Sequence, residues 1–206
     1  MHAGLTLAAA ALLAAGLQEC RDVRFLQPLS DAAPAVTEPS LEGRWTADAE
    51  NRTDFVDFER LAAGDDQYGW QSGWIQNGEE SIDDSGVVTL IQADGHLILD
   101  MAPDPDEVDG SEWLRLHSAY VVEVGDSLIL WEFRVDSILA AETAELAGLV
   151  PMEADDHLIF GGPALNVLEK LVEWAGRPGW IEPVALLWRE SGGDHPKPAS
   201  EAEAGS

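Results

Sequence analysis

The stretch Val87-Val-Thr-Leu-Ile-Gln-Ala-Asp-Gly-His-Leu-Ile-Leu-Asp-Met101 decides the fold class of this chain. Two apolar runs, Val87–Ala93 and Leu97–Met101, flank the dipeptide Asp94-Gly95. Asp-Gly is a preferred two-residue hairpin turn because both residues tolerate positive φ angles. The stretch therefore predicts two antiparallel strands joined by a tight turn.

Similar apolar runs separated by turn residues occur on both sides of this hairpin. The turn signals are Ala63-Gly64-Asp65, Asn77-Gly78 and Gly125-Asp126. The further strands that we expect are Leu41–Thr46, Thr53–Arg60, Gln67–Ile75, Trp113–Val124 and Ser127–Val135. Many short strands joined by tight turns favour an antiparallel barrel or sandwich.

After residue 135 the pattern becomes partly helical. Gly162-Pro163 opens a helix and Gly176 closes it, and its apolar residues occupy one half of the surface. Asp136–Gly148 is a weaker helix, and two more strands are expected at Asp156–Gly161 and Pro183–Glu190. The predicted fold class is mainly β (α+β), an antiparallel β-barrel or half-barrel with C-terminal helices packed on it or capping it.

The two ends of the chain differ in composition from this body. Residues 1–20 read as a signal or lipoprotein-type leader, because the apolar run Gly4–Leu17 is too short to span a bilayer. A buried N-terminal helix is the alternative. Residues 21–40 read as a Pro-rich linker, 41–190 as a single β-rich domain and 191–206 as a disordered acidic tail.

Cys20 follows the leader directly and is the only cysteine. This placement predicts lipidation of Cys20 and an exported protein of the periplasm or cell envelope. Leu17 suits a lipoprotein signal, whereas Glu19 stands where a small residue is expected. The alternative is a free thiol, with cleavage elsewhere, for example after Gly16.

The chain is strongly acidic: its 206 residues carry 39 acidic and 11 basic groups, for a formal net charge of −28. This balance argues against nucleic-acid binding and against docking on anionic lipid through a basic patch. Membrane contact is therefore expected only through a lipid anchor at Cys20. A single cysteine also excludes an internal disulfide, and we expect no cofactor.

Several short motifs together resemble a group of poorly characterised bacterial exported lipoproteins. These are Leu41-Glu-Gly-Arg-Trp45, matching an L-x-G-x-W opening, then Leu97-Ile-Leu-Asp-Met-Ala-Pro103, and then His117-Ser-Ala-Tyr-Val-Val122. The resemblance covers about residues 26–189 and implies an exported lipoprotein. The G-x-W element is also similar to the first strand of lipocalins, which implies a lipocalin-like β-barrel. Glu19 and Ala119 depart from the group's pattern, and the resemblance supplies no catalytic residues.

Sites of catalysis or metal binding are weakly indicated. His96, His117 and His157 fall on separate predicted strands, and nothing local brings them together as zinc ligands. Asp104–Gly110 lacks the spacing of an EF-hand loop, and Gly69–Gly73 misses the G-x-S-x-G motif by one residue. We therefore expect no catalytic residues, no metal and a protein that is not an enzyme.

Aromatic residues give the clearest indication of a binding site. Trp70 and Trp74 share one face of a predicted strand, and Trp131 and Phe133 share another. Aromatic faces bind sugars or apolar ligands, although they also fill cores. The predicted ligand-binding residues are Trp70, Trp74, His117, Tyr120 and Trp131.

Three functions remain open at this stage. The first is a non-enzymatic binding module for a small apolar or sugar-like ligand. The second is a structural or interaction lipoprotein with a filled barrel. The third, a hydrolase or metal enzyme centred on His117, requires at least two acidic groups or histidines within reach of that residue.

Overall fold

Eight antiparallel strands close into a barrel in the computed structural model, which describes residues 22–49, 51–61, 66–103, 116–141, 146, 148–154 and 157–190. The barrel strands are β2 (Gly43–Asp48), β3 (Thr53–Arg60), β4 (Gln67–Gln76), β5 (Glu79–Ala93), β6 (His96–Pro103), β7 (His117–Val124), β8 (Ser127–Phe133) and β11 (Ile181–Arg189). The last strand, β11, pairs with both β8 and β2 and so closes the sheet. The predicted β-barrel is confirmed, and the arrangement is lipocalin-like.

Two of the expected hairpin turns have the predicted backbone. Asp94 and Gly95 adopt φ angles of 47° and 84°, and Asn77 and Gly78 adopt 55° and 82°. Positive φ at both central residues matches the right-handed twist of the flanking strands. The stretch quoted first thus forms the β5–β6 hairpin, and its register runs from Ala93–His96 to Gly86–Pro103.

The barrel interior is an apolar core to which all eight strands contribute. At one end, here called the closed end, the indole N–H of Trp45 donates to the carbonyl of Leu41 at 2.8 Å. The guanidinium of Arg189 lies 4.6 Å from the Trp45 ring centroid and donates to the carbonyl of Glu42 at 2.8 Å. The short 3₁₀ helix η2 (Pro39–Leu41) therefore seals this end.

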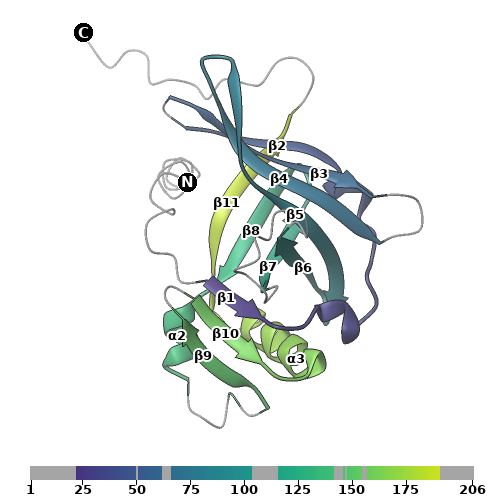
Figure 1. The fold of residues 1–206 in the computed structure, drawn as a ribbon, viewed down its shortest axis with the longest axis vertical. Helices are drawn as coiled ribbons and strands as arrows, with labels where there is room; N and C mark the ends of the chain where they lie inside the picture. The colour runs from purple at the N-terminus through teal and green to yellow at the C-terminus, as the bar shows by residue number, and fades with distance from the viewer. Residues whose placement is uncertain are drawn as a thin grey trace, which may run out of the picture.

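A second apolar core lies outside the barrel wall. It lies between the outer faces of β5 to β8 and a layer made of β1 (Asp22–Phe25), α2 (Val135–Leu139), β10 (His157–Gly161) and α3 (Ala164–Ala175). Strand β1 pairs in parallel with β10 and antiparallel with β7, and β9 (Val150–Ala154) follows β10 at the edge of the sheet. In Figure 1 these elements lie together at the bottom of the view.

The segment 21–40, expected as a Pro-rich linker, is instead part of the folded domain. Val23, Phe25 and Leu29 are at most 2% exposed, and the last of these begins the 3₁₀ helix η1 (Leu29–Asp31). Proline composition suggested a spacer, but Pro28 and Pro34 lie between β1 and η2, and Pro39 begins η2. The linker prediction was wrong because it weighed composition and ignored the apolar residues between.

The helices agree with expectation in part. α3 ends before Gly176 as predicted, with Pro163 as its N-cap. Within α3, Trp174 is 1% exposed, whereas Leu165 is 52% exposed. α2 is shorter than the helix expected over 136–148, of which residues 142–145 and 147 lie outside the described part. No helix in the described ranges is long and apolar enough to cross a bilayer.

Candidate functional site

Partly exposed apolar side chains lie on the interior face of the barrel toward the end opposite the closed end, here called the mouth. On six of the eight barrel strands, a fully buried inward residue is followed, two positions toward the mouth, by a partly exposed one. These successive pairs are Phe58 and Val56, Tyr68 and Trp70, Leu99 and Met101, Val122 and Tyr120, Leu128 and Leu130, and Leu187 and Ala185. These six side chains are therefore partly exposed to solvent, as are Leu97 and Val124 toward the closed end.

The six side chains of this inner ring are apolar or aromatic, and Glu132 lies beside them, opposite Tyr120 on the interior face. The partly exposed members of the ring are Val56, Trp70, Met101, Tyr120, Leu130 and Ala185. The indole N–H of Trp70 is buried and has no hydrogen-bond partner among the described residues. Gly86 faces it across the β4–β5 pair, and a Cβ at that glycine would lie 2.9 Å from the indole nitrogen. The glycine thus makes room for the indole against the wall.

Two of the predicted ligand-binding residues belong to this ring, and two others lie on the barrel wall elsewhere. Trp70 and Tyr120 face the interior. Trp74 is half-buried further along β4, opposite Asp54 and Ser81. Trp131 faces outward and packs against the second core, so it does not share a space with Trp70. Strand β8 carries Leu128 and Leu130 on its interior face and Trp131 and Phe133 on its outer face, so alternation alone could not tell the faces apart.

His117, the fifth predicted residue, also lies on the outer wall. Its Nδ1 atom lies 2.6 Å from Oδ1 of Asp100, which is 3% exposed. Oδ2 of Asp100 accepts the backbone N–H of Leu29 at 2.6 Å. The imidazole stacks on Phe25, with centroids 5.6 Å apart and planes at 24°. This pair fastens η1 and β1 to the barrel rather than facing the interior.

Sequence reasoning did not identify four of the six ring residues: Val56, Met101, Leu130 and Ala185. Each belongs to a predicted strand, but an aliphatic side chain in a strand carries no sign of a binding role. The barrel closure and the register of β6, β8 and β11 bring them level with Trp70. Identifying these four residues requires knowing which face of each strand points inward.

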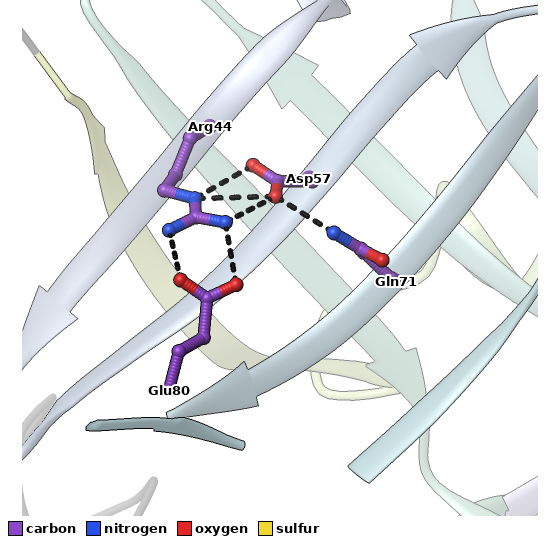
Figure 2. Close-up of polar contacts among 4 residues, drawn as sticks. All are labelled: Arg44, Asp57, Gln71 and Glu80. Carbon is purple, nitrogen blue, oxygen red and sulfur yellow. Dashed lines mark hydrogen bonds and ion pairs between the residues drawn. The ribbon is translucent and has the colours of Figure 1, made fainter. Parts of the chain in front are cut away.

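A polar cluster lies on the opposite, outer face of β2, β3 and β4 (Figure 2). Nε and Nη2 of Arg44 donate to Asp57 at 2.6–3.1 Å, and Nη1 and Nη2 donate to Glu80 at 2.9 and 3.0 Å. Gln71 donates to Asp57 at 3.1 Å. Glu80 lies beyond the bulge between Ser72 and Gly73, so Arg44 ties the outer part of the β4–β5 hairpin to β2 and β3.

The cluster is electrostatically matched. Partial burial acts to raise the pKa of Asp57, but hydrogen bonds from Arg44 and Gln71 outweigh it and hold that pKa below its usual value. The hydrogen bond from Arg44 likewise lowers the pKa of Glu80, and hydrogen bonds to both carboxylates raise the pKa of Arg44. Because Arg44 binds both carboxylates, the cluster is a structural tie across the outer face of β2, β3 and β4.

Metal binding gains no support from the described residues, among which no group of three or more His, Cys, Asp or Glu side chains could hold an ion. His117 has Asp100 as its acidic neighbour, whereas the metal or hydrolase hypothesis required at least two such groups. Cys20, the Asp104–Gly110 loop and residues 113–115 lie outside the described residues. Comparison of the chain with protein-family models, curated proteins and solved structures gave no match.

Proposed function

We propose that this protein is a non-enzymatic binding module of the cell envelope that holds a small apolar ligand inside the mouth half of its barrel. The observation that carries the proposal is the ring of partly exposed apolar side chains on the interior face. Apolar side chains left in contact with water inside a concave wall gain free energy when a ligand covers them, by about 25 cal/mol per Å².

The composition of the ring favours an apolar ligand over a sugar-like one. Sugars need several polar groups in fixed positions, because each buried hydroxyl left without a partner costs free energy. Among the six ring residues only Tyr120 and Trp70 carry a hydrogen-bonding group. The aromatic faces of the same two residues would pack against the ligand.

The envelope location rests on the sequence. The apolar run Gly4–Leu17 and the cysteine that follows it support export and acylation at Cys20. The acidic composition supports a soluble body that does not bind nucleic acid.

The test is binding of N-phenyl-1-naphthylamine, a neutral dye that fluoresces in apolar surroundings. Ala185→Trp adds bulk at a partly exposed ring position and should weaken dye binding about tenfold or more by filling the space. Ala185→Ser changes the same position with little volume and serves as the matched control. Circular dichroism of each variant establishes that it is folded.

Native mass spectrometry of the exported protein completes the test. Extra mass that leaves on denaturation is expected for a captured ligand, and an acyl mass on Cys20 for the anchor. If folded wild-type protein binds no dye and carries no extra mass, the binding proposal fails. The remaining function is then an interaction lipoprotein with a filled barrel.

A further inference from the structure

The outer face of the small sheet β1–β10–β9 is apolar and open to solvent. Val150 and Met152 on β9 are 59% and 43% exposed, two of the six most exposed large apolar side chains among the described residues. Met152 lies opposite Ile159, and Ile159 lies opposite Arg24. A Cβ at Gly161 would contact both Leu26 and Val150 at 3.7 Å, so these two side chains flank that glycine on the same face.

This face also differs from the rest of the chain in charge. None of the described side chains on this face, those of Arg24, Leu26, Val150, Met152 and Ile159, is acidic, although Asp22 begins the same strand β1. An acidic protein is repelled from most membrane surfaces, and that repulsion is weaker over the part of the face that carries no carboxylate. The second core lies behind the same sheet, so the face is held rigidly.

The position of Cys20 in the sequence favours lipid as the surface that covers this face. β1 begins at Asp22, and Val23 and Phe25 are already buried in the body. Cys20 is two residues earlier, which at full extension allows about 7 Å between it and Asp22. An anchor at Cys20 would therefore hold β1, and the sheet that contains it, directly at the lipid surface.

We propose that the β1–β10–β9 face, defined by Leu26, Val150, Met152 and Ile159, rests on the lipid bilayer and fixes the orientation of the protein there. The proposal rests on the proposed anchoring at Cys20. Contact with the interfacial region removes exposed apolar surface from water, and the free edge of β9 lies at the rim of the contact.

Cys20 is the only cysteine, so it can be coupled to maleimide-bearing lipid in phosphatidylcholine vesicles, whether or not cells acylate it. The readout is the rate at which peroxide oxidises Met152, followed by peptide mass spectrometry. We expect tethering to slow oxidation of Met152 about fivefold or more relative to protein capped with ethylmaleimide beside the same vesicles. Trp188 is 51% exposed on β11, near the closed end. Trp188→Met therefore provides a matched methionine whose oxidation should not slow on tethering.

Val150→Glu places a charge on the face and should return Met152 of the tethered protein to the rate of the capped protein, while Trp188→Glu should leave the protection intact. Equal rates for tethered and capped wild-type protein would overturn the proposal. Protection that grows with protein concentration in the absence of vesicles would also overturn it, and would assign the face to a second copy of the chain. The mass of the exported protein reports acylation separately. A bare Cys20 with a protected Met152 would thus reject the anchor and retain the affinity of this face for lipid.

Discussion

Asp100 shows how one buried carboxylate organises a whole segment. It is 3% exposed, and its two oxygens are used by two different partners, His117 and the backbone N–H of Leu29. A buried acid is tolerated only when it is paired or hydrogen-bonded. The contact with Leu29 joins the barrel wall to the N-terminal segment that the sequence suggested was a linker, and His117, held by Asp100, stacks on Phe25 of the same segment.

Asp100→Ala should therefore destabilise the protein by about 2 to 3 kcal/mol, because it leaves a buried backbone N–H and an imidazole without partners. Asp100→Asn retains one acceptor and should lose less. Urea unfolding measures both free energies.

His117→Ala should leave dye binding undiminished, since His117 lies outside the barrel. A loss of dye binding in a stable His117→Ala protein would contradict that placement.

Asp57 gives a prediction about pH. Its pKa is lowered in the folded protein, so its contribution to stability is complete above its unfolded pKa of about 3.9 and disappears as pH falls through the folded value. Asp57→Asn should cost about 1 kcal/mol at pH 7. The difference from wild type should close below about pH 4. Thermal unfolding between pH 7 and pH 3 measures this, with the exposed Glu123→Gln as control. A difference independent of pH would exclude an ionic origin.

At the scale of elements, the sequence predicts turns and strands that depend on neighbouring residues. The Asp94-Gly95 and Asn77-Gly78 turns and the strands beside them follow from residues close together in the sequence. The parallel pairing of β1 with β10 joins Asp22 to His157, and no nearby residue announces such a contact. For the same reason the sequence did not reveal which aromatic residues point inward. Trp70 and Trp131 occupy similar strands, and only barrel closure places them on opposite sides of the wall.

The pairing of β4, β5 and β6 depends on Gly86. The sequence alone does not show how closely the neighbouring strands approach this residue. A Cβ there would lie 2.2 Å from the carbonyl oxygen of Ala102 and 2.9 Å from Nε1 of Trp70. Because the first of these is backbone, Gly86→Ala must displace a strand and should cost about 1 to 3 kcal/mol. Gly125→Ala, where nothing lies within 4 Å, is the control and should stay within about 0.5 kcal/mol of wild type. Equal stability of the two variants would mean that the sheet yields easily at Gly86.

At the scale of the whole molecule, the small sheet adjoins only one side of the mouth. β1 pairs with β7 where that strand begins, at His117 and Ser118, and β7 begins at the mouth. In Figure 1 the β4–β5 hairpin and the small sheet lie at the top and the bottom of the view. If the small sheet rests on lipid, the start of β7 lies near the bilayer and the β4–β5 hairpin points away from it.

The net charge of −28 leads to a prediction for the molecule as a whole. Like charges spread over a compact surface repel each other more than they do in the unfolded chain, so screening should stabilise the fold. At 1 M salt the screening length is about 3 Å, short enough to suppress this repulsion while sparing contacts such as the one between Arg44 and Asp57. The melting temperature should therefore rise from low salt to 1 M sodium chloride at pH 7. Near pH 4.1, the estimated isoelectric point, the net charge vanishes and the rise should largely disappear. Calorimetry at both pH values measures this. An equal rise at both would assign the effect to preferential exclusion of salt from the protein surface and not to charge repulsion.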